Sequence, residues 1–235
     1  MKILGYTPEL SVLIPCYNEK STILEVIRRV KEVPIEKEII VVSDGCTDGT
    51  RQLLKQAAHN FGGFRAVYHK RNLGKGCAIR SALKKARGRF VIIQDADLEL
   101  DPYDYPELLR PVRGGKATVV FGSRFKVNSA SISPMSRLGN FVVTTLANLL
   151  YGMKISDEAC CYKVMPTELM RSLNLHSSHF DFCPEVTAKL RKRGYKICEV
   201  PVQFNPRTVS QGKKIGWKDG FEAVWTLIKY RFIDD

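Results

Sequence analysis

Three carboxylates, Asp95, Asp97 and Glu99, lie within five residues of one another, directly after the apolar segment 89–94. Three negative charges at such spacing repel one another unless a cation lies between them. Carboxylate oxygens suit Mg²⁺ or Mn²⁺, and Mg²⁺ is commonly held by one or two carboxylates with phosphates completing its shell. The motif therefore predicts a divalent-metal site. The alternative is a solvated acidic turn that caps a helix starting near Asp101.

Positively charged side chains in loops are the second chemical signal. Lys75 stands between two glycines. Arg124 follows a predicted strand, Arg137 lies at the start of a predicted helix, and the segment 205–214 is a basic loop. Such residues suit phosphate groups, although each of them taken alone is more commonly a solvated surface charge. The residues concerned are Lys75, Arg124, Arg137, Arg207, Lys213 and Lys214.

The elements that must position these residues alternate between strand and helix patterns. Short apolar runs rich in β-branched residues predict strands, and apolar residues at helical spacing predict helices between them. The expected strands are 10–15, 38–42, 64–69, 89–94, 117–122 and 195–204, with a short one near Tyr162. The expected helices are 21–31, one through 53–57, 77–86, 102–112, 136–151, one from Pro166, and 184–193.

This alternation predicts an α/β fold, a Rossmann-like domain whose central, mostly parallel sheet is flanked by helices. Ligands of such sheets bind outside the carboxyl ends of the strands, and the acidic motif and the loop containing Lys75 both follow strands. No Pro/Gly/Ser-rich linker or repeat divides the chain. We therefore expect one domain over 1–235, with a nucleotide-binding half (1–122) and an elaborated half (123–235).

The composition is that of a globular chain with a basic surface. Lysine and arginine total 37 against 24 acidic residues, a formal charge of +13, and 44% of residues are hydrophobic. A disordered tail, a collagen-like fibre and a small disulfide scaffold are excluded. The charge fits nucleic acid, an anionic membrane or a phosphate-rich small substrate. Because no zinc finger or RNA-binding strand motif is present, nucleic acid is not expected as a partner.

No membrane span or export signal is expected. The longest apolar stretch, 141–151, is interrupted by polar residues and is shorter than the roughly 20 residues that cross a bilayer. The first nine residues lack the pattern of a secretory signal. Seven cysteines without paired spacing indicate reduced thiols. These features predict a cytoplasmic protein, with peripheral attachment to the cytosolic face of a membrane as a further option.

Four ordered motifs together resemble the family 2 glycosyltransferases, closest to the branch of dolichol-phosphate mannose synthase and other polyprenyl-phosphate glycosyltransferases. The resemblance covers nearly the whole chain and implies a GT-A fold. In chain order, the motifs are Pro15-Cys16-Tyr17-Asn18-Glu19, Asp44-Gly45-Cys46-Thr47-Asp48-Gly49-Thr50, Arg71-Asn72-Leu73-Gly74-Lys75-Gly76 and Asp95-Ala96-Asp97. Further matches are Gly122-Ser123-Arg124-Phe125, Cys161-Tyr162-Lys163 and the segment 204–214.

The resemblance implies a role for each donor-side residue. Pro15, Tyr17 and Glu19 are similar to the loop that holds the base and ribose of the nucleotide, and Asp44 to a carboxylate that binds the base. The usual Asp-Asp-Gly-Ser of the family reads Ser-Asp-Gly-Cys here, so that one carboxylate is missing. Lys75 is expected to reach the donor diphosphate.

The resemblance also implies a metal cluster and an anion-binding set. Asp95, Asp97 and Glu99 resemble the ligands of Mg²⁺ or Mn²⁺, with Asp97 the first choice. Arg124, Arg137, Arg207, Lys213 and Lys214 match positions that bind the donor diphosphate and the phosphate of the lipid acceptor.

The expected reaction is inverting transfer of a hexose from a nucleotide-diphosphate sugar, UDP-glucose or GDP-mannose, to a polyprenyl or dolichyl phosphate. A phosphate acceptor is already anionic at neutral pH and needs no strong base, whereas a hydroxyl acceptor would need one, and Asp157 or Glu185 are the candidates. Helix capping is an equally good explanation of Asp157.

The last predicted helix, 222–232, is amphipathic, with aromatic and basic neighbours. Docking on an anionic membrane and packing on the protein core are both compatible with it.

Two rival functions remain open at this stage. A sugar nucleotidyltransferase also needs an α/β fold and Mg²⁺, but it should have a glycine-rich basic loop after the first strand, where this chain has Pro-Cys-Tyr-Asn-Glu. The other is a non-catalytic basic protein that binds nucleic acid or membrane.

Overall fold

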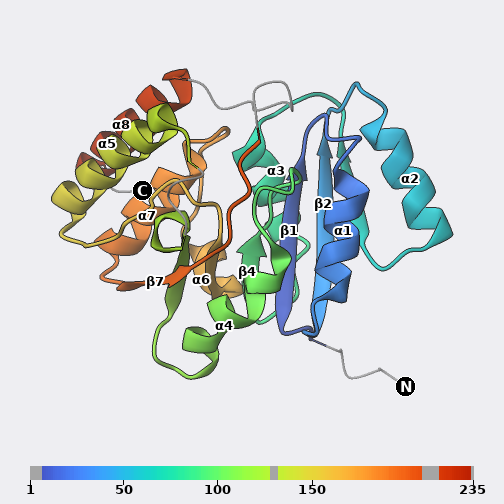
Figure 1. The fold of residues 1–235 in the computed structure, drawn as a ribbon, viewed down its shortest axis with the longest axis horizontal. Helices are drawn as coiled ribbons and strands as arrows, with labels where there is room; N and C mark the ends of the chain where they lie inside the picture. The colour runs from blue at the N-terminus through green and yellow to red at the C-terminus, as the bar shows by residue number, and fades with distance from the viewer. Residues whose placement is uncertain (1–6, 128–131, 208–216, 234–235) are drawn as a thin grey trace.

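The computed structural model describes residues 7–127, 132–207 and 217–233, and its centre is a seven-stranded sheet (Figure 1). The strands lie in the order β3-β2-β1-β4-β6-β5-β7. All neighbouring pairs are parallel except the two that involve β6, which is antiparallel to β4 and to β5. The strands are β1 (Leu10–Cys16), β2 (Lys37–Asp44), β3 (Arg65–His69), β4 (Phe90–Ile93), β5 (Val119–Ser123), β6 (Lys163–Pro166) and β7 (Ile197–Pro201).

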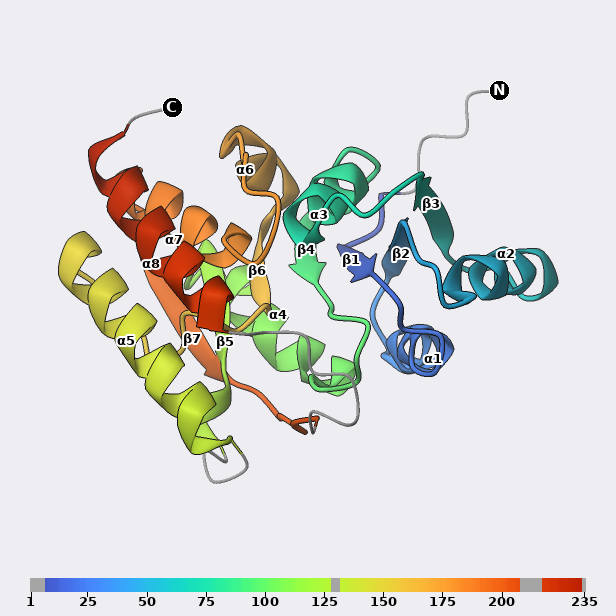
Figure 2. The ribbon, with the colours of Figure 1, turned by 90° about the horizontal axis from the view of Figure 1, so that it is seen from above.

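Helices cover both faces of the sheet (Figure 2). In that view α1 and α4 lie on one side and α3 and α6 on the other, while α5 and α8 pack beside α7 at one end. The α-helices are α1 (Ile23–Glu32), α2 (Thr50–Asn60), α3 (Lys75–Leu83), α4 (Tyr105–Arg113), α5 (Pro134–Tyr151), α6 (Thr167–Ser172), α7 (Phe182–Lys192) and α8 (Trp217–Phe232). Two short 3₁₀ turns are η1 (Pro102–Asp104) and η2 (Arg124–Lys126).

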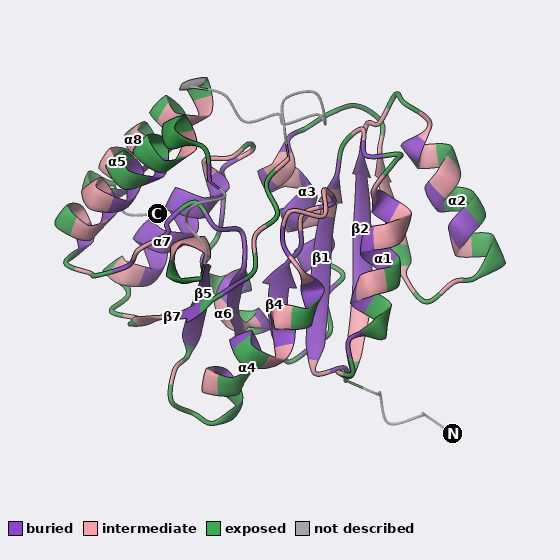
Figure 3. Ribbon diagram, viewed as in Figure 1, coloured by how far each residue is buried: buried purple, intermediate pink, exposed green. Residues whose placement is uncertain are grey.

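The central strands are buried on both faces, as expected for a parallel sheet between helix layers (Figure 3). Every residue of β4 is buried, and β1 is buried except for half-buried Pro15. A second, smaller core lies between α5, α7 and α8, where Val143, Tyr151 and Leu227 meet. One hydrophobic core therefore fixes the sheet, and the other attaches the two outer helices.

The predicted α/β architecture with a mostly parallel sheet is confirmed, with differences at element ends. The predicted strand 195–204 is paired only over Ile197–Pro201, and Phe204 instead forms an isolated bridge with Leu100. The predicted helix 184–193 begins earlier, at Phe182, because a proline is well tolerated in the first turn of a helix.

Candidate active site

The acidic motif is positioned by a buried glutamine at the end of β4. Gln94 is fully buried, and its side-chain oxygen accepts hydrogen bonds from the hydroxyls of Tyr105 and Tyr162, each at 2.6 Å. Its side-chain nitrogen donates to the carbonyl of Leu100 at 3.3 Å. Because the turn is anchored to the core at both ends, the carboxylates between Gln94 and Leu100 occupy defined positions at the edge of the sheet.

Two basic side chains from distant loops contact the carboxylates of this motif. The ammonium of Lys75 lies 2.6 Å from Oδ1 of Asp95. The guanidinium of Arg207 lies 3.1 Å from Oδ2 of Asp97, and the backbone amide of Arg207 donates to Glu99 at 2.9 Å. The structure thus brings together five of the residues that the sequence singled out.

Glu19 completes the group of acids around Arg207. Its carboxylate lies 3.0 Å from the Arg207 guanidinium and is only 7% exposed. The hydroxyl of Thr22 lies 2.7 Å from the carbonyl of Ala96, which joins the loop after β1 to the acidic turn. Three loops, following β1, β4 and β7, therefore meet at one point.

The electrostatics of this point fit a bound cation. Burial first, and then repulsion from Asp95 and Glu99, raise the pKa of Asp97 to about 7 despite the contact with Arg207. Burial alone would raise the pKa of Asp95, but Lys75, together with Cys161 and Arg124, lowers it. Asp95 is thus neutralised by Lys75, whereas Arg207 supplies one positive charge to the three carboxylates of Glu19, Asp97 and Glu99. Oxygen ligands with excess negative charge suit Mg²⁺ or Mn²⁺.

Lys75 is held in place by close packing of the backbone around its flanking glycines. A Cβ atom on Gly74 would lie 2.2 Å from the carbonyl oxygen of Ser178, and one on Gly76 would lie 2.2 Å from that of Ser177. The amide of Gly76 donates to the Ser178 carbonyl at 2.8 Å. Both positions therefore exclude a side chain, and the 177–178 segment fixes the first turn of α3, where Lys75 lies.

Asp44 supports the same loop. Its carboxylate accepts hydrogen bonds from the amides of Leu73 at 3.0 Å and Gly74 at 2.8 Å, and its Oδ1 lies 2.6 Å from Nδ1 of His69. Asp44 is 2% exposed. The structure thus gives Asp44 a positioning role for the loop that carries Lys75, and the contact with a nucleotide base implied by the resemblance stays a prediction.

The other predicted nucleotide-binding residues lie at the same edge of the sheet. Pro15 is the half-buried second-last residue of β1, and Tyr17, just after the strand, is 38% exposed. An open hollow of about 470 Å³ lies beside them, lined by Asn18, Lys20, Ser21 and Asp48.

Arg124 and Asp157 form a buried bidentate pair. Nε of Arg124 donates to Oδ2 of Asp157 and a terminal nitrogen to Oδ1, each at 2.8 Å, and the Arg124 amide also donates to Oδ2 at 3.0 Å. The Asp157 side chain is fully buried, and the guanidinium of Arg124 stacks 5.1 Å from the ring centre of Phe204. Both oxygens of Asp157 are engaged in holding Arg124, and its role as a catalytic base stays a prediction that this contact does not favour.

Glu185, the other base candidate, is also a structural residue. It is fully buried and accepts hydrogen bonds from the amides of His176 and Ser177, each at 2.8 Å, and from the hydroxyl of Tyr230 at 2.9 Å. It therefore links the loop that packs on Gly74 and Gly76 to helix α8, and it is closed to a substrate hydroxyl.

Of the remaining predicted phosphate-binding residues, the structure describes only Arg137. Arg137 is exposed on α5 and lines a separate cavity of about 220 Å³ together with Phe125, Asn140 and Ser156. Lys213 and Lys214 lie outside the described residues.

Aromatic residues near the basic side chains were not identified from the sequence. The ring of Phe180 lies 5.3 Å from the Lys75 ammonium, and Phe204 stacks on Arg124. Neither phenylalanine has a spacing that links it to its basic partner. His69 was also missed, although it pairs with Asp44 across the parallel strands β2 and β3, a register that could have suggested it.

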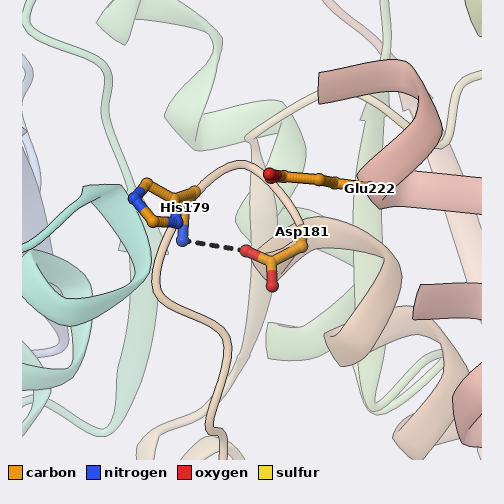
Figure 4. A group of neighbouring side chains, drawn as sticks. All are labelled: His179, Asp181 and Glu222. Atoms are coloured by element: carbon orange, nitrogen blue, oxygen red, sulfur yellow. Dashed lines mark hydrogen bonds between the residues drawn. The ribbon is translucent and has the colours of Figure 1, made fainter. Parts of the chain in front are cut away.

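A second group of potential metal ligands, also missed, lies between α8 and the loop that precedes α7 (Figure 4). Within the part of the chain that the structure describes, the ligand atoms of His179, Asp181 and Glu222 all lie within 4.8 Å of one another, a clustering that Asp95, Asp97 and Glu99 do not show. His179 and Glu222 are exposed, and the His179 amide donates to Asp181 at 2.8 Å. This hydrogen bond accounts for the position of Asp181 without an ion.

A mostly parallel sheet with one antiparallel strand inserted between β4 and β5, and acids following β4, defines a GT-A fold. The family model for glycosyl transferase family 2 matches residues 11–173. The chain therefore belongs to glycosyl transferase family 2.

The chain is similar to named glycosyltransferases of two organisms. The chain is 29% identical over 241 residues to the dolichyl-phosphate beta-glucosyltransferase ALG5C of Trichomonas vaginalis, covering 93% of this chain and 71% of that protein. It is 28% identical over 208 residues to the glycosyltransferase AglD of Haloferax volcanii and 30% identical over 206 residues to the hexosyltransferase Agl6 of the same organism, each over 85% of this chain. The chain spans only 33% and 48% of the lengths of these two proteins.

A solved structure with the same fold is that of glucosyl-3-phosphoglycerate synthase from Mycobacterium tuberculosis in complex with UDP. The TM-score is 0.73 at 19% identity, covering 97% of this chain and 82% of that one. Another structure of that synthase, with a TM-score of 0.69 at 20% identity over 97% of this chain and 80% of that one, contains Mn²⁺, UDP and phosphoglyceric acid.

Proposed function

We propose that this protein transfers a hexose, with inversion, from a nucleotide-diphosphate sugar to a polyprenyl or dolichyl phosphate. The observation that carries the proposal is the meeting of Lys75 and Arg207 with the acidic motif after β4. Such an arrangement suits two anions, a donor diphosphate and an acceptor phosphate, which would otherwise repel each other.

Each half of the site has a distinct task. Residues from 1–122 bind the donor, with Pro15, Tyr17 and Glu19 around the nucleotide and Lys75 on the diphosphate. Residues from 123–235 bind the acceptor, with Arg124 and Arg207 orienting its phosphate, joined by Arg137, Lys213 and Lys214.

Mg²⁺ or Mn²⁺ would be held by Asp97, with Asp95 and Glu99 closing the shell, and when bound it neutralises charge on the departing nucleoside diphosphate. The protein contributes by positioning the two substrates and by supplying fixed positive charge where the leaving group forms.

The state of the two base candidates supports a phosphate acceptor rather than a hydroxyl. A phosphate monoester is an anion at neutral pH, so its oxygen attacks the anomeric carbon without losing a proton to the protein. A hydroxyl acceptor needs a carboxylate free to take its proton, whereas Asp157 and Glu185 are both buried and fully engaged.

The names and ligands of similar proteins suggest which donor sugar nucleotide to test first. The similar Trichomonas proteins are named dolichyl-phosphate beta-glucosyltransferases, and the similar Mycobacterium synthase binds UDP. UDP-glucose is therefore the first donor to test and GDP-mannose the second.

The face formed by α5 and α8 supports peripheral membrane binding. No described helix combines the length and the apolar character that a membrane crossing needs. The helices lie side by side (Figures 1 and 2), and both expose large apolar side chains. Those on α5 are Met135, Leu138, Phe141, Val142 and Leu149, and those on α8 are Phe221, Trp225 and Phe232.

This α5–α8 face has basic neighbours. Arg137, Lys154, Lys229 and Arg231 are exposed on the same two helices or directly after α5. An anionic leaflet attracts basic residues by about 1 kcal/mol each. Meanwhile Leu227 and Tyr230 are buried against α5 and α7, so α8 packs on the protein with one side and exposes apolar residues on the other. We propose that the α5–α8 face lies on the cytosolic surface of a membrane, where the lipid acceptor resides.

The reaction is tested with labelled UDP-glucose, GDP-mannose and a UDP-N-acetylhexosamine, each supplied with Mn²⁺ and a short polyprenyl phosphate. We expect labelled lipid and free nucleoside diphosphate with UDP-glucose, and loss of both when the metal is chelated. Arg207→Ala should lose at least 100-fold of the rate, whereas Arg110→Ala, which removes a surface arginine that is 76% exposed, should not.

Transfer to a soluble hydroxyl acceptor, with none to the lipid phosphate, would refute the acceptor assignment. Release of pyrophosphate would instead identify a nucleotidyltransferase.

Membrane binding is tested by sedimentation with vesicles containing anionic lipid. The double variant Phe141→Ala/Trp225→Ala should bind several-fold more weakly. Phe61→Ala provides a matched control, because Phe61 and Phe141 are both 66% exposed but Phe61 follows α2 at the other end of the sheet. Equal loss in both variants, or no binding by the parent protein, contradicts this part of the proposal.

A further inference from the structure

Two cysteines lie next to each other where the first two strands end. β1 and β2 are parallel neighbours, and Cys16, the last residue of β1, is paired in register with Ser43 of β2. Cys46 follows three residues after Ser43, in the turn that leads to α2.

The contacts of Cys46 connect it directly to the loop of Cys16. Its sulfur donates to the carbonyl oxygen of Cys16 at 3.3 Å and accepts from the amide of Asn18, also at 3.3 Å. Neither cysteine is in a disulfide, and the contact of the Cys46 sulfur with the Cys16 carbonyl makes the two residues neighbours across the two loops.

The environment of Cys46 favours its thiolate. The neighbouring Cys16 thiol is the largest influence and, against the effect of burial, lowers the pKa of Cys46 to about 6, with help from the amide of Asn18. The Asp48 carboxylate acts in the opposite direction. The thiolate is the reactive form of cysteine, so Cys46 is a nucleophile at neutral pH.

Accessibility assigns different roles to the two sulfurs. Cys46 is half-buried, and its neighbours Asn18 and Asp48 line the open hollow of about 470 Å³. Cys16 is 1% exposed. A small disulfide can therefore reach Cys46 first, while Cys16 is placed to react only with its neighbour.

We propose that Cys46 and Cys16 are a reversible thiol–disulfide pair that exchanges with low-molecular-weight disulfides such as glutathione disulfide. The Cys46 thiolate attacks one sulfur of glutathione disulfide and releases one glutathione thiolate. The Cys16 thiol then loses its proton to water and attacks the Cys46 sulfur, which releases the second glutathione. Two protein thiols are oxidised to one disulfide and glutathione disulfide is reduced to two thiols.

The disulfide would act on the nucleotide side of the site. The loops after β1 and β2 are joined by hydrogen bonds from Thr47 N to Asn18 Oδ1 at 2.8 Å and from Lys20 N to Asp48 at 3.1 Å. Asn18, at this junction, has a left-handed backbone conformation, with φ of 51°. Pulling Cys46 onto β1 disturbs the same loop that carries Tyr17 and Glu19, and we expect weaker nucleotide binding.

The five remaining cysteines differ from this pair. Cys77 is half-buried in α3, and its sulfur donates to the hydroxyl of Ser178 at 3.4 Å. Cys160, Cys161 and Cys183 are buried, and burial raises the pKa of each. Cys198, on the edge strand β7, is partly exposed like Cys46 but lies far along the sheet from it. Cys198→Ser is therefore a suitable control.

The experiment incubates the folded protein in glutathione buffers of increasing oxidised fraction, blocks free thiols by alkylation and identifies linked peptides by mass spectrometry. UDP and GDP binding is measured calorimetrically on the same samples. We expect a Cys16–Cys46 linked peptide that disappears with reductant, and at least a fivefold loss of nucleotide affinity in the oxidised protein. Cys46→Ser should remove both effects, and Cys198→Ser neither.

Stable glutathione on Cys46 with no Cys16–Cys46 linkage would overturn the proposal, as would a linkage that leaves nucleotide affinity unchanged. The disulfide itself does not depend on the proposed function, whereas its effect on affinity does. If the linked peptide forms but the reduced protein binds neither nucleotide, the thiol pair stands and the proposed function fails.

Discussion

Replacing Asp157 with asparagine distinguishes a residue that holds Arg124 from one that takes a proton from the acceptor. The two side chains share a bidentate contact at 2.8 Å, with Asp157 fully buried and Arg124 17% exposed. Asparagine keeps the shape and one acceptor oxygen but removes the charge. The Arg124 guanidinium then remains buried with no opposite charge against it.

The expected cost follows from that burial. Removing one partner of a buried ion pair destabilises a protein by about 3–5 kcal/mol. Because asparagine still accepts one hydrogen bond, we expect the lower end, about 3 kcal/mol. For a chain of this size that is a fall in Tm of roughly 6–12 °C. The exposed pair Arg110–Glu107 provides the control, since Glu107→Gln should cost at most about 1 kcal/mol.

The assay combines thermal or urea unfolding with turnover in Asp157→Asn, Arg124→Met and the double variant. If Asp157 acts by holding Arg124, the double variant is more stable than Asp157→Asn, because the unpaired guanidinium is gone, and it is no slower than Arg124→Met. An Asp157→Asn protein that keeps its Tm within about a degree but loses its turnover would refute this reasoning and restore Asp157 as a base.

Three further outcomes can be checked. Burial raises the pKa of Asp104 to about 6, above its value in the unfolded chain, so the ionised form of Asp104 opposes folding at neutral pH. Asp104→Asn can still accept the hydrogen bond from the amide of Gln203, and it should raise the free energy of unfolding by about 1–2 kcal/mol at pH 8 but by close to zero at pH 4. Urea titrations measure both values, and an equal gain at the two pH values contradicts the raised pKa. Gly76→Ala should lower the free energy of unfolding by at least about 2 kcal/mol and weaken nucleotide binding, because its Cβ would lie 2.2 Å from the Ser177 carbonyl; unchanged unfolding shows that the loop can move. The rate of Cys46 alkylation by iodoacetamide should rise with pH through a midpoint near 6, followed by peptide mass spectrometry, and a midpoint near 8.5 shows an ordinary thiol.

Local patterns determined much of the fold. Apolar runs and helical spacing predicted the parallel strands β1 to β5 and the helices that follow them, because burial on both faces requires continuous apolar residues. The loops at the carboxyl ends of these strands could be placed on one edge of the sheet, because parallel strands all end on the same side. The acidic motif, Lys75 and Arg207 were predicted as site residues from the sequence and its resemblance to the family, and the structure brings them into contact.

Contacts between distant segments could not be read in this way. The antiparallel insertion of β6 between β4 and β5 depends on packing over the whole sheet, and its four residues carry no signal of direction. The engagement of Asp157 by Arg124 and of Glu185 by two backbone amides is seen only in the structure, although each carboxylate was a candidate base from the sequence.

The sequence by itself determined which residue types are present at the ends of the strands, since strand and turn patterns are local. The tertiary structure decided which charges neutralise each other and which cysteines meet, because residues 19, 97 and 207, or 16 and 46, become neighbours only when separate loops pack against one another. The free energy of a buried charge or thiol depends on such neighbours, and spacing along the chain does not specify them.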